Sequence, residues 1–330
     1  MARLVSFDTV WTEITKAYNP AFLKALMGIP GARVYAFGGI ITDLSLGRPW
    51  KDLDARVIWD VPRSMQEQEI PRVLEQHVDI VQKFSFTDGL VFRVREPSGK
   101  NMIIDIGVAN NFNVFTSDFT ACSIFMDLKT GEIVEMYPNS VHDLEHEIVR
   151  MDPRVYGELE KYPFYTFRAL KLATKGNFRI DSDFGAFLRT RGAYVQRATN
   201  ELVAYIQENG KDSIAEFYLG NIFGGFKSGA HQYVELLEEY NFLREMCLVL
   251  QEQFGTKSLP ISIPSHLAER FAATETLEQR LSLIVSTIAR AISDTPAECF
   301  KTLVHALAFD TGRSDGNEFV VDPTKVGFVL

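Results

Sequence analysis

The most constraining feature of this sequence is the stretch from Val34 to Asp60, VYAFGGIITDLSLGRPWKDLDARVIWD. It begins with a short apolar run that is typical of a buried strand. Gly38 and Gly39 follow, where no Cβ would obstruct a turn of the backbone or the approach of a ligand. A short helix is predicted next, from Ile41 to Leu46, and its first backbone amides would face a phosphate lying over the glycines. This order of elements predicts a phosphate-binding turn.

Two aspartates follow the predicted turn. Asp52 and Asp54 stand two residues apart at the start of a second apolar run, which predicts another strand. Side chains two apart on a strand share a face, so both carboxylates would lie together. A carboxylate pair beside bound phosphates is a half-site for Mg²⁺. The same pair at a strand edge is also common as a solvated pair without metal, and the DxD residues alone leave both interpretations open.

The complete pattern resembles the head of the class II tRNA nucleotidyltransferases and bacterial poly(A) polymerases, within the DNA polymerase beta superfamily. In that family a glycine pair is followed by DxD, as Gly38-Gly39 is followed by Asp52 and Asp54 here. The likeness continues in sequence order. Residues 117–128, SDFTACSIFMDL, are similar to the family's RDFTxNA segment, and residues 141–150, VHDLEHEIVR, to its GxxDLxxxxiR segment. Together these motifs indicate a divergent member with a head over residues 1–150.

The resemblance implies a set of catalytic residues. Asp52 and Asp54 would hold two Mg²⁺ ions, and Asp105, on a predicted strand from Met102 to Val108, would assist in activating the attacking hydroxyl. The residues alone leave Asp105 open between this role and that of a structural hydrogen-bonding group. Asp118 would contact the nucleotide together with the two glycines, and it could instead cap the helix that follows it.

A downstream segment departs from the family pattern. Where the family has EDPxRxxRxxRFA, which reads the base of the incoming nucleotide, residues 161–173 of this chain are KYPFYTFRALKLA. Arg168 matches, Lys171 keeps a positive charge, and Tyr162 and Tyr165 replace an acidic residue and an arginine. Tyrosines offer mainly a stacking surface, whereas an acid and an arginine present a fixed hydrogen-bonding edge. We therefore predict a looser nucleotide-binding set of Tyr162, Tyr165, Arg168 and Lys171, with the choice between ATP and CTP open. The alternative is that base recognition is lost and the head remains as a scaffold.

Basic residues gather next to this segment. From Arg154 to Arg197 the chain carries nine Lys or Arg against four Asp or Glu, in a protein with a net charge of −9. Such a track could take a single RNA end, with Tyr and Phe side chains available for stacking. The alternative is an ordinary solvated helical face.

Composition and periodicity set the architecture. At 330 residues and 46% hydrophobic, the chain can form two or three domains. We predict an α+β fold: a head with a mixed or antiparallel sheet, a neck over residues 151–210, and an all-helical body and tail over residues 211–330. Within the head we expect a helix over residues 64–84 and a hairpin of strands 90–95 and 102–108. No membrane-spanning run, signal pattern or CxxC spacing is present in the sequence, so a cytoplasmic protein without a zinc site is expected.

The predicted function is template-independent transfer of nucleotides from an NTP, ATP or CTP, to an RNA 3′ end. The acceptor would be a tRNA CCA end or a poly(A)-type end, and Mg²⁺ would be the cofactor. One alternative is a non-catalytic RNA- or nucleotide-binding protein on the same fold, which the altered segments favour. Another is a nucleotidyltransferase whose acceptor is a protein or a small molecule. The base added, the acceptor and the oligomeric state stay open.

Overall fold

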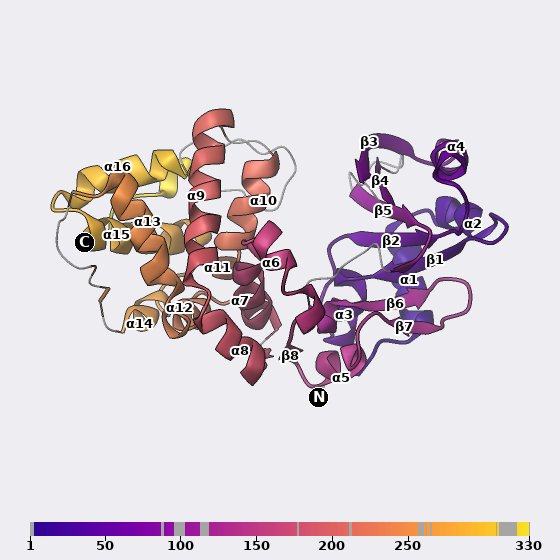
Figure 1. Ribbon diagram of the computed structural model, residues 1–330, viewed down its shortest axis with the longest axis horizontal. Helices are drawn as coiled ribbons and strands as arrows, with labels where there is room; N and C mark the ends of the chain where they lie inside the picture. The colour runs from indigo at the N-terminus through magenta and orange to yellow at the C-terminus, as the bar shows by residue number, and fades with distance from the viewer. Residues whose placement is uncertain are drawn as a thin grey trace. The chain divides into compact units, whose positions relative to one another are not determined.

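The computed structural model describes residues 3–86, 89–95, 103–112, 119–176, 178–210, 213–256, 261, 263–264, 266–307, 309 and 322–329. The chain forms two compact units, Met1–Asp152 and Pro153–Leu330. Figure 1 colours them from indigo to magenta and from magenta to yellow. The boundary predicted between a neck and a body, at residue 210, stays a prediction.

A seven-stranded sheet forms the centre of the first unit (Figure 1). Its strand order is β3-β4-β5-β2-β1-β6-β7. β2 and β5 pair in parallel, and every other neighbouring pair is antiparallel. This mixed sheet confirms the predicted α+β class. The strands are β1 (Arg33–Phe37), β2 (Leu53–Ile58), β3 (Asp79–Phe86), β4 (Gly89–Arg95), β5 (Ile103–Ala109), β6 (Ile124–Asp127) and β7 (Ile133–Glu135).

The two faces of this sheet differ in polarity because side chains alternate along each strand. On β2, Leu53, Ala55 and Val57 are fully buried, whereas Asp54 and Arg56 are only partly buried. The pairing of β2 with β5 extends these two faces to β5, because Ile104 lies beside Leu53 and Asp105 lies beside Asp54. One face is therefore apolar core, and the other carries charge. The helices of this unit are α1 (Phe7–Ala17), α2 (Ala21–Met27), α3 (Gly39–Ser45), α4 (Arg63–Leu74) and α5 (Ser140–Glu145), with the 3₁₀ turn η2 (Thr120–Cys122) and the short strand β8 (Ile148–Val149).

The prediction of one helix over residues 64–84 is wrong in its second half. α4 ends at Leu74, and the amides of His77 and Val78 both donate to the Leu74 carbonyl, which closes a turn. β3 then begins at Asp79 and pairs antiparallel with β4. Residues such as Ile80 suit a strand as well as a helix, so spacing alone does not separate the two. The predicted hairpin of residues 90–95 and 102–108 is confirmed as β4 and β5, although its turn lies outside the described residues.

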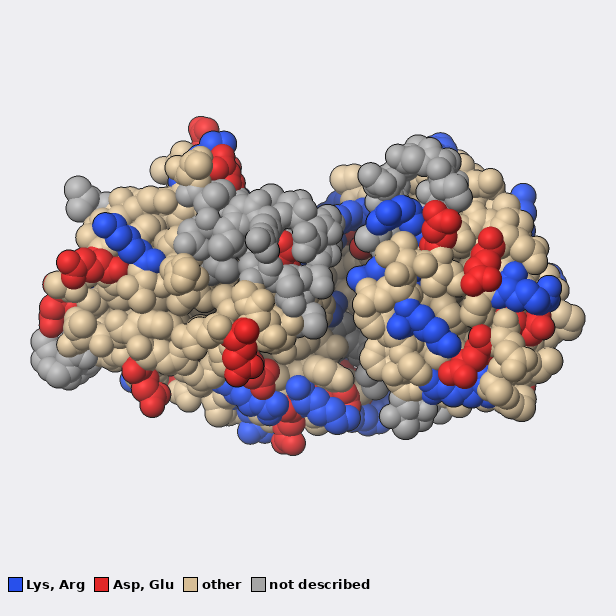
Figure 2. Space-filling model, turned by 90° about the horizontal axis from the view of Figure 1, so that it is seen from above, with Lys and Arg blue, Asp and Glu red and all other residues tan. Residues whose placement is uncertain are grey.

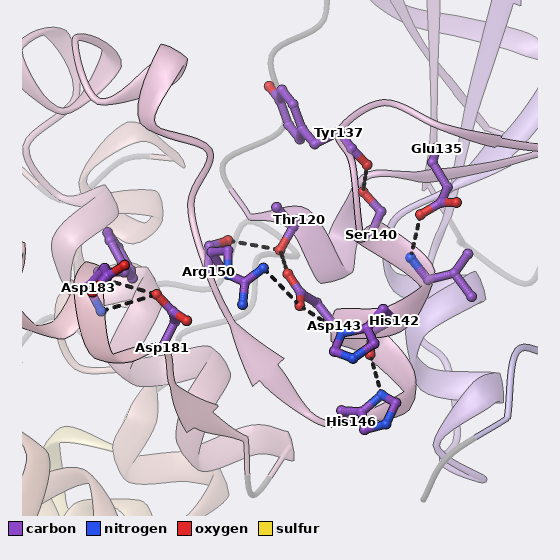
Figure 3. A network of polar contacts seen from close by, with 12 residues as sticks. Thr120, Glu135, Tyr137, Ser140, His142, Asp143, His146, Arg150, Asp181 and Asp183 are labelled. Atoms are coloured by element: carbon purple, nitrogen blue, oxygen red, sulfur yellow. Dashed lines mark hydrogen bonds and ion pairs between the residues drawn. The ribbon is translucent and has the colours of Figure 1, made fainter.

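A buried carboxylate joins the two segments that carry the later family motifs (Figure 3). Asp143, on α5, is fully buried and accepts a hydrogen bond of 2.6 Å from the Thr120 hydroxyl. Its other oxygen lies 3.5 Å from Arg150 Nη1. Thr120 and Arg150 are also joined directly, because the Thr120 amide donates to the Arg150 carbonyl at 2.9 Å. These contacts give Asp143 a structural role in the first unit.

The second unit is helical, as predicted for the neck and body, apart from the two-residue strand β9 in the predicted neck. Its elements are η3 (Pro153–Val155), α6 (Glu158–Lys161), α7 (Tyr165–Gly176), β9 (Arg179–Ile180), α8 (Ser182–Arg189), α9 (Gly192–Asn209), α10 (Ser213–Ile222), α11 (Gly225–Ser228), α12 (Ala230–Glu239), α13 (Phe242–Phe254), α14 (Leu267–Phe271), α15 (Leu277–Ile292), α16 (Pro296–Ala306) and η4 (Pro323–Lys325). α9 packs on α13, and α15 on α16 (Figure 1). Across the described residues of both units, none of the helices combines the length and the apolarity needed to span a bilayer.

Candidate active site

The glycine turn borders the carboxylates that the sequence singled out. β1 ends at Phe37, and Gly38 has φ +67°, a left-handed conformation that glycine adopts without strain. A Cβ at Gly38 would lie 3.2 Å from Asp54 Oδ2, and one at Gly39 would lie 3.8 Å from Asp52 Oδ1. The backbone turn and the two carboxylates are therefore in direct proximity, as the sequence predicted.

Asp52 and Asp54 fit a divalent cation as a pair of oxygen donors. Asp52 is exposed just before β2, and Asp54 is partly buried opposite Phe37 of β1. Nowhere in the described parts of the chain do three His, Cys, Asp or Glu side chains converge on a metal position. A cation held here would take its remaining oxygen ligands from substrate phosphates and water, as Mg²⁺ commonly does.

A third acidic side chain beside the glycines was not predicted. Asp43, on α3, is 3% exposed, and its Oδ2 would lie 3.9 Å from a Cβ at Gly39. The helical spacing from Gly39 to Asp43 brings the side chain to this point, because residues four apart share a helix face. That spacing was the available signal in the sequence.

Asp105 lies beside Asp54 but is held by an arginine. Its Oδ1 accepts a hydrogen bond of 2.9 Å from Arg93 Nε, and its Oδ2 accepts one of 2.9 Å from Arg93 Nη2. This hydrogen bonding to Asp105 is the main reason that the pKa of Arg93 is raised above its ordinary value. The geometry is that of a structural hydrogen-bonding group, one of the two interpretations that the sequence left open.

Arg56 also lies on the charged face and was missed from the sequence. Burial lowers its pKa to about 10, while the charges of Asp54 and Asp105 act in the opposite direction. The guanidinium carbon lies 4.4 Å from the centre of the Phe37 ring, within range of a cation–π contact. Strand alternation from Asp54 was the signal for Arg56. Arg93 could not be found in this way, because its register with Asp105 depends on strand pairing.

The predicted nucleotide-binding residues of the second unit fall into two groups. Tyr162 and Tyr165 lie with ring centres 5.5 Å apart, and the Arg168 guanidinium carbon lies 5.4 Å from the Tyr165 ring centre. Tyr162 is 44% exposed, so its ring can accept a stacking partner. Lys171 instead donates a hydrogen bond of 3.0 Å to the Gly220 carbonyl, which places its ammonium in helix packing. Asp118 lies outside the described residues.

The basic track over residues 154–197 is partly neutralised within the second unit. Lys161 forms an ion pair of 2.8 Å with Glu158, Arg197 one of 2.7 Å with Glu201, and Arg189 one with Glu239. On the face in Figure 2, basic and acidic side chains are interspersed. These pairs favour the interpretation of an ordinary solvated surface for at least part of the track.

Comparison with solved structures gives a consistent result for the fold. A Thermotoga maritima CCA-adding enzyme complexed with tRNA matches with a TM-score of 0.59 and 13% identity, over 92% of this chain and 70% of that one. A CCA-adding enzyme with CTP matches with a TM-score of 0.55 and 14% identity, over 93% and 71%. A tRNA-processing enzyme in an apo form matches with a TM-score of 0.52 and 15% identity, over 90% and 74%.

No protein-family model and no curated protein sequence matches the chain. Identities this low establish the fold alone. The chain has the fold of the CCA-adding enzymes, and the resemblance that its motifs predict is confirmed at that level.

Proposed function

We propose that this protein is a nucleotidyltransferase that adds nucleotides from an NTP to an RNA 3′ end, with tRNA as the first candidate acceptor. The observation that carries the proposal is the proximity of the glycine turn to Asp54 and Asp52. The fold supports it, because similar structures include CCA-adding enzymes complexed with tRNA and with CTP.

Each part of the site has a task in this reaction. The open backbone at Gly38 and Gly39 lets the triphosphate approach, and the first amides of α3 face it. Asp52 and Asp54 would hold Mg²⁺, which supplies Lewis-acid stabilisation of the phosphate charge when bound. In the second unit, Tyr162, Tyr165 and Arg168 would offer a stacking surface and a positive charge to a nucleotide. In-line transfer needs no covalent enzyme intermediate, so positioning and charge neutralisation suffice.

The test is an incubation of the protein with Mg²⁺, each labelled NTP in turn, and a tRNA that lacks its 3′ end. We expect extension of the RNA, and a loss of at least 10²-fold in rate in Asp52→Ala, because one of the two proposed metal ligands is removed. Asp79→Ala is the matched control, since Asp79 is an exposed aspartate of the same sheet. Equal activity of Asp52→Ala and the wild type would contradict the proposal.

A specific observation favours a second candidate, a non-catalytic RNA- or nucleotide-binding protein. Arg93 takes both oxygens of Asp105, and Arg56 places a positive charge close to Asp54. Binding of the RNA without any extension would support this candidate. Label that appears on the protein or on a small molecule, and not on RNA, would instead support a different acceptor.

A further inference from the structure

The charged face of the sheet brings together carboxylates and arginines from three strands. Parallel pairing places Asp54 of β2 beside Asp105 of β5, and antiparallel pairing places Arg93 of β4 opposite Asp105. Arg56 lies two residues beyond Asp54 on the same face. Neighbouring strands are about 4.8 Å apart and residues rise about 3.3 Å along a strand, so these four side chains arise within about 12 Å of one another across the sheet.

Arg93 neutralises the negative charge of Asp105 through a bidentate, hydrogen-bonded ion pair. Both carboxylate oxygens accept from the guanidinium, each at 2.9 Å. Planar, bidentate pairs of this kind are among the strongest charge-assisted hydrogen bonds. Each carboxylate oxygen of Asp105 keeps a second lone pair, but the positive charge of Arg93 repels a divalent cation from this group.

Arg56 is fixed in a notch that only a glycine provides. A Cβ at Gly107, the neighbour of Arg56 on β5, would lie 1.8 Å from Arg56 Nη1. The Phe37 ring flanks the same guanidinium. A guanidinium is positively charged at neutral pH, so Arg56 places a positive charge on the face that also carries Asp54 and Asp105.

The balance of charge limits how many cations this face can hold. Asp52, Asp54, Asp105 and the buried Asp43 beside Gly39 carry four negative charges, and Arg56 and Arg93 carry two positive charges, which leaves a net charge of −2. One divalent ion on Asp52 and Asp54 changes this to 0, whereas two ions would raise it to +2 in a partly desolvated site. Like charges at such distances repel strongly when water is partly excluded.

We propose that Arg56 and Arg93 take the place of one divalent ion, so that the protein binds a single ion, on Asp52 and Asp54, with Asp105 withheld as a ligand. Arg56 then supplies the second positive charge of the site, next to the position of the reacting phosphates. This inference rests on the proposed function for its catalytic meaning, and it concerns the ions that the protein itself binds before a nucleotide adds its phosphate ligands.

The test counts bound Mn²⁺ by electron paramagnetic resonance, in a titration of the full chain without nucleotide. We expect one ion per chain for the wild type and two for Arg93→Met, in which Asp105 is released as a ligand. Adding Asp105→Asn to Arg93→Met should return the count to one. Arg95→Met is the matched control, because Arg95 is an exposed arginine two residues along the same strand, and its count should stay at one.

Two further variants keep the result clear if Arg93→Met does not fold. Asp105→Asn alone should still bind one ion, and Asp54→Asn should bind none. A wild-type count of two or zero, an unchanged count in folded Arg93→Met, or loss of the ion in Asp105→Asn would overturn the inference. The RNA-extension assay is independent of these counts. A protein that fails to extend RNA but shows the expected ion counts would contradict the proposed function and not this inference. A protein that extends RNA but binds two ions would contradict this inference and not the proposed function.

Discussion

At the scale of single residues, the charged face depends on small side chains as much as on charged ones. Gly107 is required because Arg56 lies across it, and Gly38 because its left-handed backbone lies next to Asp54. Neither requirement involves flexibility of the chain. Gly107 leaves space for the Arg56 guanidinium, and Gly38 adopts a backbone conformation with positive φ beside Asp54.

The role of Gly107 can be tested by adding one methyl group. In Gly107→Ala the new Cβ would lie 1.8 Å from Arg56 Nη1 and 2.7 Å from its Cζ, so the guanidinium must leave its position against Phe37. We expect the free energy of unfolding to fall by about 1–3 kcal/mol, as for other overpacked sites. Urea denaturation measures this change.

Gly157→Ala is the matched control for this substitution. A Cβ at Gly157 would meet no atom within 4 Å, and its backbone is right-handed helical. Its stability should be unchanged or slightly higher, because alanine restricts the unfolded chain. A Gly107→Ala variant as stable as Gly157→Ala would show that the notch is not needed.

At the scale of elements, the β6–β7 hairpin is closed by one carboxylate. Asp127 Oδ1 accepts from the amides of Lys129 and Thr130 at 2.8 and 2.9 Å, and Oδ2 accepts from Arg33 Nε at 2.9 Å. Burial alone raises the pKa of Asp127, but these hydrogen bonds outweigh it, so the pKa lies below its ordinary value. The ionised form is therefore the one that stabilises the turn.

Because only the ionised form stabilises the turn, the contribution of Asp127 to the free energy of unfolding depends on pH. A carboxylate with a lowered folded pKa stabilises the protein above its unfolded pKa of about 3.9, and the stabilisation is lost as the pH falls through the folded value. We expect Asp127→Asn to lower the free energy of unfolding by about 1–3 kcal/mol at pH 7. The difference from the wild type should shrink below about pH 4.

Chemical denaturation at a series of pH values measures this difference. Asp79→Asn, on an exposed part of β3, should show little change at any pH. If the difference in the free energy of unfolding between Asp127→Asn and the wild type stayed constant from pH 7 to pH 3, the stabilising role of the ionised Asp127 would be contradicted.

Another element-scale feature is the attachment of residues 322–329 to α15. Four side chains spaced four residues apart on α15 form hydrogen bonds with this segment. Glu278 accepts from the Asp322 amide at 3.2 Å, and Ser282 accepts from the Gly327 amide at 3.0 Å. Ser286 accepts from the Val329 amide at 2.9 Å, and Arg290 donates to the Val329 carbonyl. Residues four apart share a helix face, so α15 presents one continuous row of hydrogen-bonding groups.

Removing one hydroxyl from this row should loosen the segment locally. In Ser286→Ala the Val329 amide loses its acceptor, and a hydrogen bond of this kind contributes about 0.5–1.5 kcal/mol. We expect amide hydrogen exchange in residues 322–329 to become several-fold to about tenfold faster. Mass spectrometry of the C-terminal peptide measures the rate. Thr302→Ala on α16 is the control, and equal exchange in both variants would refute the attachment.

At the scale of the whole molecule, each compact unit is a continuous piece of chain with its own core. The first unit buries one face of its sheet beneath helices, and the second buries helix faces such as those of α9 and α13. Fragments 1–152 and 153–330 should therefore each fold alone. Calorimetry should show a cooperative transition for each fragment, and a fragment without one would show that its core is incomplete.

The sequence by itself determined the class of fold and the position of the proposed site. The glycine pair, the DxD residues and the alternation of β2 are local features, so their structure follows from residues close in sequence. The second half of the stretch over residues 64–84 was predicted incorrectly, because β-branched residues such as Ile80 fit both periods and pairing with β4 decided the outcome.

Only the tertiary structure decided the state of Asp105 and the presence of arginines beside it. Arg93 is twelve residues from Asp105 in sequence and reaches it only through the register of β4 on β5. The notch at Gly107 likewise exists only because β5 lies beside β2. Electrostatic interactions fall off with distance in space, and the side chains that face each other across two strands depend on the register of pairing, which the spacing of residues along one strand does not give.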